Sequence, residues 1–197
     1  MKTKLISFVL ILLLSAPMAF SQSADKGKTA FAIIGGVNMQ NLNGKDNAGN
    51  KLTNNMIIGY HVGVNIQIPL VPEFYFQPWL LFSTKGAKTS LSTIKLSYIE
   101  LPLNFVYKGL LGSGFVMVGF GPYVAYGIGG KVATVYGELK PFDAGGNIFA
   151  GYEMAGGLFF QLNAQLGMLK INPGTGSSTD KLAVKNTGFG LSLGYRF

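Results

Sequence analysis

Few side chains of this sequence could carry out catalysis or bind a metal ion. His61 is the one histidine and cysteine is absent, so a multi-histidine site, a thiolate metal site, a disulfide and a lipid-modified cysteine are all excluded. A Ser-His-Glu hydrolase would need His61 at an open rim of the fold, whereas the alternation of its neighbours points it inward. We therefore expect no catalytic, cofactor-binding or metal-binding residue, and we interpret His61 as a hydrogen-bonded interior residue.

Three charged side chains, Glu100, Glu153 and Arg196, lie in alternating segments at inward-facing positions. A carboxylate in a confined interior needs a cation or several donors, and the Arg196 guanidinium can offer two parallel donors. We expect Glu153 and Arg196 to lie near the same end of the fold and to pair, whereas Glu100 could reach Lys95 or side-chain amides. The inward amides are Asn65, Gln67, Gln77, Asn104, Gln161, Asn163 and Gln165. The set is interpreted as a structural polar network, and the alternative is the lining of a narrow conductive path.

These residues are positioned by segments in which apolar residues alternate with small or polar ones. The clearest case is the last segment, where Phe189, Leu191, Leu193, Tyr195 and Phe197 alternate with Gly188, Gly190, Ser192, Gly194 and Arg196. Such alternation places the two sets on opposite faces of a strand. The pattern predicts eight strands, at residues 29–39, 56–69, 74–85, 93–107, 114–127, 143–154, 158–170 and 185–197.

The composition indicates that these strands lie in a membrane. Hydrophobic residues make up 48% of the chain and charged residues 12%, whereas a soluble domain usually carries about 25% charged residues. After residue 28 no segment is long and apolar enough for a transmembrane helix, but most strands are long enough to cross a bilayer. Only a closed barrel satisfies the backbone of strands in lipid. The sequence therefore predicts an all-β fold, a closed eight-stranded antiparallel up-and-down transmembrane barrel whose interior is filled by side chains.

The connections between these strands alternate in length. Those at residues 69–73, 108–113 and 155–157 are short, and those at 40–55, 86–92, 128–142 and 171–184 are mostly longer. In outer-membrane barrels the short turns are periplasmic, so we expect both termini on the periplasmic side. Eight lysines then lie in or beside the external loops: Lys45, Lys51, Lys85, Lys88, Lys131, Lys140, Lys181 and Lys185. They would face the phosphates of lipopolysaccharide, or they are the ordinary solubilising residues of loops.

The first residues predict export. Lys2 and Lys4 precede an apolar run from Leu5 to Leu14 and a small-residue exit at Ala19-Phe20-Ser21, the three parts of a secretory signal peptide. We expect a signal peptide at residues 1–21, a short polar lead at 22–28 and the barrel domain at 29–197. Removing Lys2 and Lys4 lowers the formal charge from +8 to +6. Arg196 is the single arginine and no basic aromatic cluster occurs, so this charge suits anionic lipid head groups better than nucleic acid.

Aromatic residues could form girdles at the two membrane interfaces. The candidates are Tyr60, Trp79, Tyr98, Tyr107, Tyr123, Tyr126, Tyr152 and Tyr195. The alternation of its strand places Trp79 on the inward face next to Pro78, so it is either a girdle residue, a core residue or the mark of a bulge.

The segment Tyr98-Ile-Glu-Leu-Pro-Leu-Asn-Phe-Val-Tyr-Lys108 resembles a strand of the porin-family, PorT-like outer-membrane β-barrel domain of Gram-negative bacteria. Gly35, Gly36 and Asn38, the stretch Gly119-Phe-Gly-Pro-Tyr123 and the aromatic C-terminus are similar to that family as well. The resemblance implies a cell outer membrane location but no particular activity. Tyr195 and Phe197 look like the C-terminal signal that the barrel assembly machinery recognises in its substrates.

Three functional classes remain open for such a barrel. The first is a monomeric structural or surface-interaction protein that acts through cationic external loops and has no enzymatic activity. The alternative is a narrow porin or a conduit for hydrophobic solutes, and a more remote one is a lipid A-modifying enzyme. A soluble lipocalin-like carrier also has eight alternating strands, but the charged residues here are too few to coat its outer wall.

Overall fold

The computed structural model describes residues 28–130, 133–134, 137–172 and 181–197, so the predicted signal peptide (1–21) and residues 22–27 of the predicted lead lie outside the described residues. Eight strands form a closed barrel: β1 (Ala30–Lys45), β2 (Ile57–Val71), β3 (Phe74–Lys88), β4 (Thr93–Leu111), β5 (Gly114–Gly130), β8 (Phe142–Glu153), β9 (Leu158–Gly167) and β10 (Ala183–Arg196). Two short strands, β6 (Ala133–Thr134) and β7 (Gly137–Glu138), pair with each other between β5 and β8. No helix in the described ranges is long and apolar enough to cross a membrane.

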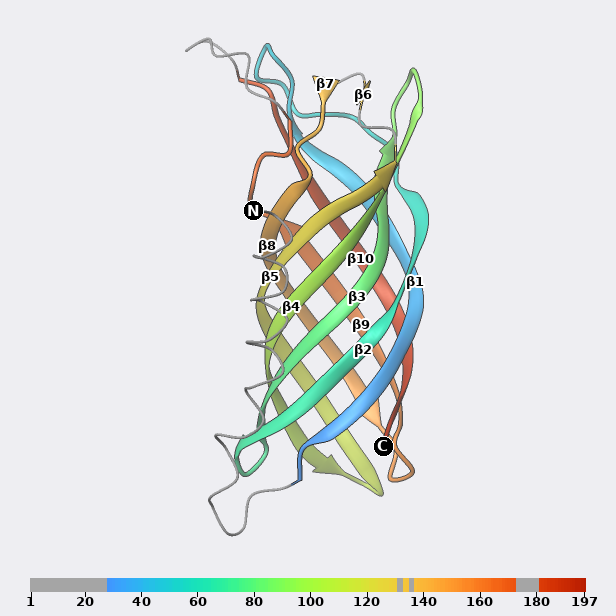
Figure 1. Ribbon diagram of the computed structural model, residues 1–197, viewed down its shortest axis with the longest axis vertical. Helices are drawn as coiled ribbons and strands as arrows, with labels where there is room; N and C mark the ends of the chain where they lie inside the picture. Colours follow the sequence, from blue (N-terminus) through green and yellow to red (C-terminus); the bar gives the residue numbers. More distant parts are fainter. Residues whose placement is uncertain (1–27, 131–132, 135–136, 173–180) are drawn as a thin grey trace, which may run out of the picture.

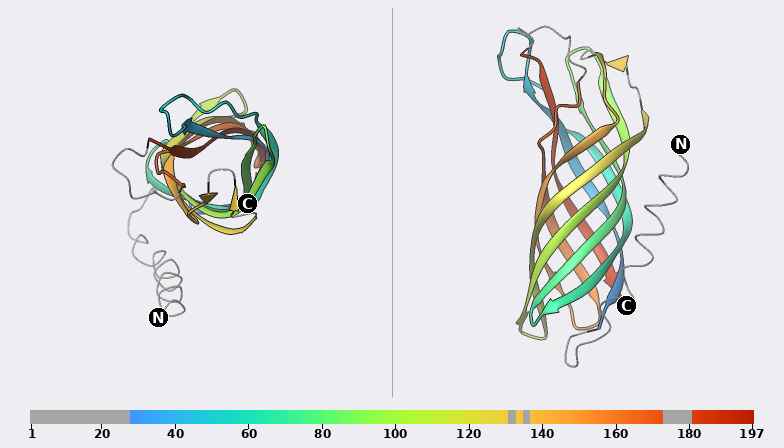
Figure 2. Two further views of the ribbon diagram at one scale, coloured as in Figure 1. Left: turned by 90° about the horizontal axis from the view of Figure 1, so that it is seen from above. Right: turned by 60° about the vertical axis from the view of Figure 1, so that its left-hand side comes forward.

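The strand order around the barrel is β1-β10-β9-β8-β5-β4-β3-β2, and every neighbouring pair is antiparallel. Each barrel strand therefore pairs with the barrel strands before and after it along the chain, and β1 closes on β10. Figures 1 and 2 show the resulting cylinder of tilted strands. The predicted eight-stranded up-and-down barrel is confirmed.

The strands extend further toward one end of the barrel than the sequence pattern indicated. Pairing of β1 with β10 continues from Ala32↔Arg196 as far as Lys45↔Ala183, whereas the alternation had placed the end of the first strand at residue 39. Beyond that point Asn41, Asn43 and Lys45 interrupt the apolar alternation. The hydrogen bonds between strands do not need an apolar face, so the two strands continue as a polar arm.

The connections at the two ends of the barrel differ in length. At one end, Pro72-Glu73, Gly112-Ser113 and the segment 154–157 join consecutive strands, and Figure 1 places the C-terminus at this end. At the other end the connections span residues 46–56, 89–92, 131–141 and 168–182. One expectation is wrong here, because the predicted loop at 86–92 is only the turn Thr89–Ser92. The Thr89 hydroxyl closes this turn by donating to the Ser92 carbonyl at 2.8 Å and accepting from the Ser92 amide at 3.0 Å.

The outward face of the barrel is apolar, and the inward face combines polar and apolar side chains. Ile58 and Phe120, which point outward, are 76% and 62% exposed, while the inward Asn104 is fully buried. Of the girdle candidates, Tyr60, Tyr107, Tyr126 and Tyr195 are exposed. Tyr98 and Tyr123 are instead buried in the interior, so the girdle prediction is wrong for these two, and Trp79 is buried as well, which agrees with the alternative of a core residue. Their positions share the inward parity of neighbours such as Glu100, Ala125 and Leu81.

Candidate functional site

The interior of the barrel, called the lumen below, contains two clusters of buried charges. The first lies toward the short turns and is built by Lys108 of β4, Glu153 of β8 and Arg196 of β10. The Glu153 carboxylate accepts from Arg196 Nε at 2.9 Å and from Lys108 Nζ at 2.6 Å. Arg196 Nη1 also donates to Asn65 Oδ1 at 3.2 Å. The arrangement satisfies one carboxylate with two cations, so this cluster carries a net positive charge.

The second charged cluster lies nearer the long connections. Lys85 Nζ is 3.1 Å from Glu100 Oε1 and 3.6 Å from Asp143 Oδ2, and all three side chains are almost completely buried. The Lys85 ammonium also faces the rings of Tyr123 and Tyr98, at 4.6 and 5.4 Å from their centroids. The two carboxylates and one cation give this cluster a net negative charge.

Neutral donors bind three of the four carboxylate oxygens of the second cluster. Glu100 accepts from the Ser83 hydroxyl and from Gln165 Nε2, the latter at 2.7 Å. Asp143 Oδ2 accepts from the Tyr123 hydroxyl at 3.1 Å and from Asn186 Nδ2 at 2.9 Å. A buried ion pair is stable only when hydrogen bonds satisfy its remaining lone pairs. The donors therefore let two carboxylates share one lysine.

His61 and Ser192 form a polar contact in the lumen. His61 Nε2 is 2.8 Å from Ser192 Oγ, which also accepts from Asn163 Nδ2 at 3.1 Å. A serine beside a histidine can be a nucleophile beside its base, but both side chains are buried. The cavity beside them has a volume of about 40 Å³. This space suits a few water molecules and would not admit a lipid ester.

The lumen also contains two apolar clusters. One lies at the long-connection end, where Leu42, Ile94, Ile171 and Val184 belong to a buried cluster that also includes Tyr98 and Tyr123. The other contains Trp79, whose ring centroid is 5.3 Å from that of Phe149, and the buried residues Ala32, Ile34, Leu81, Val106, Met117 and Phe159. Bulky apolar side chains thus fill much of the lumen beside the polar residues.

The structure places the inward residues named from the sequence as follows. Glu100, Glu153, Arg196, Asn65, Gln67, Gln77, Asn104 and Gln161 are buried, and Asn163 and Gln165 are partly buried. Gln77 donates to Asn65 at 2.8 Å, and Asn104 accepts from Asn147 at 2.6 Å. Tyr195 and Phe197 lie on the outside with their ring centroids 5.2 Å apart.

Two expectations about lysines are wrong. Lys85 is predicted in or beside an external loop, at the end of strand 74–85, but it is fully buried inside the barrel on β3. Lys95 was a candidate partner of Glu100, but it is exposed, and Lys85 takes that role. Both errors have the same cause. Every second residue of β3 points into the barrel, and this alternation continues to Lys85, the last residue of the predicted strand. The inward positions are Gln77, Trp79, Leu81, Ser83 and Lys85.

Alternation along the strands also marks two inward charged residues for which no prediction is made above. Lys108 shares the parity of Asn104 and Glu100 on β4, and Asp143 shares that of Phe149 and Glu153 on β8. The contact of Ser192 with His61 had no such signal, because it joins strands β10 and β2 that flank β1. No group of three or more His, Asp or Glu residues suited to a metal ion occurs within the described part of the chain.

Comparison with known proteins agrees with this architecture. The family model described as "Outer membrane protein beta-barrel domain" matches residues 20–172. The chain is similar to Ail, the attachment invasion locus protein of Yersinia pestis, solved in complex with sucrose octasulfate: 14% identity over 87% of this chain and 100% of that chain, with a TM-score of 0.41. It is also similar to the outer membrane protein AlkL, solved by solid-state NMR in DMPC bilayers: 12% identity over 90% of this chain and 94% of that chain, with a TM-score of 0.46. No curated protein matches the sequence.

Proposed function

Because the chain belongs to the outer membrane protein β-barrel domain family, we propose that it is a non-conducting barrel that binds anionic molecules at the cell surface through the lysines of its long-connection end. The proposal includes export by a cleaved signal peptide, a monomeric state and insertion by the barrel assembly machinery through Tyr195 and Phe197. The PorT-like resemblance remains a prediction.

The observation that carries the proposal is the filled lumen. Lys85, Glu100 and Asp143 neutralise one another in part inside the barrel, as do Lys108, Glu153 and Arg196. Apolar side chains around Trp79 and at the long-connection end fill more of the lumen. An eight-stranded barrel has little more interior than its side chains occupy. Interaction with other molecules is therefore left to the outer surface.

The surface of the long-connection end supports a role in binding anions. Among the described residues, its exposed or partly exposed lysines are Lys45, Lys51, Lys88, Lys95, Lys140, Lys170, Lys181 and Lys185, while Lys131, which is also predicted there, lies outside the described residues. Asp46 lies at the same end, but its carboxylate accepts the Asn50 backbone N–H at 2.8 Å. This bond holds the pKa of Asp46 below its usual value. Lysines near anionic lipid head groups attract them by roughly 1 kcal/mol each.

The first test replaces these eight lysines by glutamine. Wild-type protein in neutral detergent micelles should retain lipid A and phosphatidylglycerol in preference to phosphatidylcholine, as counted by native mass spectrometry. The eightfold variant should lose that preference, because the attraction depends on the charges. The heat-modifiable mobility of the barrel on electrophoresis serves as the folding control. Equal retention of all three lipids by the wild-type protein would contradict the proposal.

The second test addresses the alternative of a narrow pore. Purified protein in planar bilayers should give no steady single-channel conductance, because packed side chains, Trp79 and Phe149 among them, fill the lumen. The control is a large-channel porin measured in the same bilayers. A steady conductance that changes in the Glu100→Gln variant would replace the proposal by a transport function.

A further inference from the structure

Two surface depressions meet on the outer wall of the barrel. The first is an apolar groove of about 630 Å³ over β4, β5, β8, β9 and β10, and the second is a pocket of about 770 Å³ at the long-connection end. Leu166 and Thr187 line both, and they are cross-strand partners on β9 and β10. Both volumes are in the range of ligand sites. The two depressions therefore form one continuous surface, called the wall site below.

The groove exists because small residues face outward at its centre. Pro122 pairs with Gly146 across β5 and β8, and Ile148 pairs with Ala164 across β8 and β9. A Cβ atom added at Gly146 would meet nothing closer than Met168 Cε at 3.6 Å. Larger side chains border this floor, and Phe105, Phe120, Leu166, Met168 and Phe189 are all about half exposed or more. The result is an apolar slot on the face that contacts lipid.

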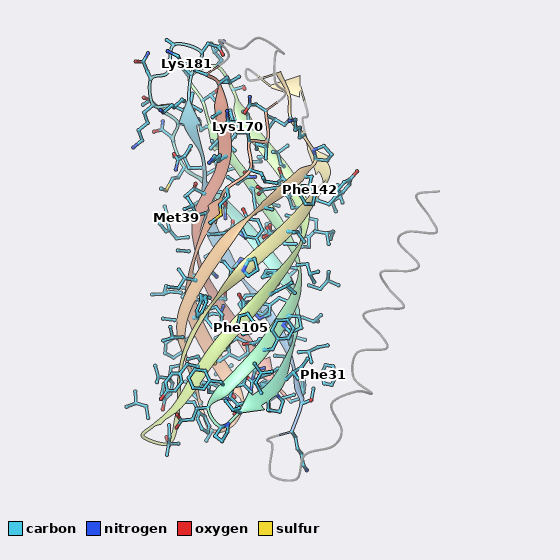
Figure 3. All side chains as sticks on the ribbon, turned by 90° about the vertical axis from the view of Figure 1, so that its left-hand side faces the viewer. Phe31, Met39, Phe105, Phe142, Lys170 and Lys181 are labelled. Carbon is cyan, nitrogen blue, oxygen red and sulfur yellow. The ribbon has the colours of Figure 1, made fainter. Side chains whose placement is uncertain are left out.

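The pocket above the groove is cationic. Lys45, Lys170, Lys181 and Lys185 line it, and none of its described lining residues is acidic. Figure 3 shows Lys170 and Lys181 at the loop end of the barrel, with Phe105 on the wall below. The Lys181 side chain lies against the β1–β2 loop, since a Cβ atom added at Gly49 would be 3.1 Å from Lys181 Cδ.

The order of the residues along the strands matches the order of groups in an anionic lipid. Along β10 the outward positions run from Lys185 through Thr187 to Phe189, from the cationic pocket into the apolar groove. The end of β9 and the residues that follow it do the same, from Lys170 through Met168 to Leu166. A ligand here would place a negative group beside the lysines and apolar chains along the wall.

We propose that the wall site binds one phosphorylated glycolipid of the outer leaflet, with its phosphates in the lysine pocket and an acyl chain in the groove. The inference rests on the proposed function, because it assumes that the long-connection end faces outward and binds anions. It goes further by assigning that binding to four of the lysines and to one stripe of the barrel wall. Lysine supplies the charge that phosphate recognition requires.

The chain offers matched variants for a test. The pocket variant changes Lys45, Lys170, Lys181 and Lys185 to glutamine. The control variant changes Lys51, Lys88, Lys95 and Lys140, which are exposed at the same end but do not line the pocket. The two variants lose the same charge. For the groove, Ala164→Leu fills the floor, and Ala150→Leu makes the same change at an outward position of β8 outside it.

The experiment counts lipid A retained by each full-length protein in neutral detergent, using native mass spectrometry, with dephosphorylated lipid A and phosphatidylglycerol as comparison lipids. The pocket variant should retain lipid A at least about tenfold less than wild type, since each lysine near a head group contributes roughly fivefold. The control variant should change by less than about twofold, because distant exposed charges are screened. Ala164→Leu should weaken retention several-fold and Ala150→Leu should not. Dephosphorylated lipid A should bind as weakly to wild type as lipid A binds to the pocket variant.

Other outcomes separate this inference from the proposed function. Equal losses in the pocket and control variants would overturn the wall site but leave a cationic rim that binds anions. Unchanged retention in both would overturn both proposals. Retention of phosphatidylglycerol as strong as that of lipid A, with the same sensitivity to Ala164→Leu, would overturn the assignment to a glycolipid. Heat-modifiable mobility identifies any variant that fails to fold, and single lysine variants of the pocket then replace the fourfold one.

Discussion

Lys85→Met is expected to destabilise the folded barrel by roughly 3–5 kcal/mol, the usual cost of removing one partner from a buried ion pair. Lys85 is fully buried and lies 3.1 Å from Glu100 and 3.6 Å from Asp143. Without it, two carboxylates share a small volume with no cation. The measurement is the unfolding midpoint in urea or guanidinium, followed by the mobility shift between the folded and unfolded forms.

Two further variants make this result specific to the cluster. Lys88→Met, three residues along the same strand, removes an exposed lysine and should change stability by no more than about 0.5 kcal/mol. The triple variant Lys85→Met, Glu100→Gln, Asp143→Asn removes all three charges and should recover most of the loss, because it leaves no unpaired ion in the lumen. If Lys85→Met were as stable as Lys88→Met, the buried cluster described here would be wrong.

Gly36→Val is expected to destabilise the barrel by about 3 kcal/mol or to prevent its closure, as overpacking against immobile atoms does. Gly36 of β1 is paired with Ser192 of β10. A Cβ atom at residue 36 would overlap the backbone carbonyl oxygen of Leu191 and lie 2.8 Å from His61 Cε1. The carbonyl belongs to the strand ladder that closes the barrel, so it cannot move without disturbing that ladder. The yield of heat-modifiable protein after refolding into micelles measures the effect.

The matched control for Gly36→Val is Gly146→Val on β8. A Cβ atom at Gly146 meets only Met168 Cε at 3.6 Å and the Gly121 carbonyl oxygen at 4.0 Å. The same substitution should therefore leave refolding close to wild type. Normal refolding of Gly36→Val would mean that β1 and β10 approach less closely than the structure has them.

The strand pattern could be predicted from sequence because each strand has lipid on one face and packed side chains on the other. Residues such as Leu191 and Leu193 alternate with Ser192 and Gly194 for that reason alone. The ends of the strands could not be found in this way. Beyond the membrane the outward face of β1 no longer needs apolar residues, although its pairing with β10 continues to Lys45. Lys85, at the end of the predicted strand 74–85, is therefore expected in or beside a loop although it is buried.

The composition of the lumen was easier to predict than its contacts. Parity alone places Glu100, Glu153 and Arg196 inside, and the same rule applies to Tyr98, whose aromatic ring suggested a membrane interface instead. Which inward residues meet depends on how far adjacent strands are shifted along one another, because this shift sets the tilt of the strands. Glu153 of β8 reaches Lys108 of β4 across the intervening β5. The approach of Glu153 to Lys108 therefore cannot be predicted from the sequence of either strand.

The barrel closes only when β1 pairs with β10, so this pairing also sets the time at which the fold is complete. The residues that it joins are far apart in sequence: Ala32 pairs with Arg196 and Gly36 with Ser192. Contacts over such separations form slowly, because the chain must lose much of its freedom before any pair is made. Until β10 arrives, β1 has hydrogen-bonded neighbours on one side only and presents an open edge to other chains. Correct assembly of this fold thus requires that β10 pairs with β1 before another chain does.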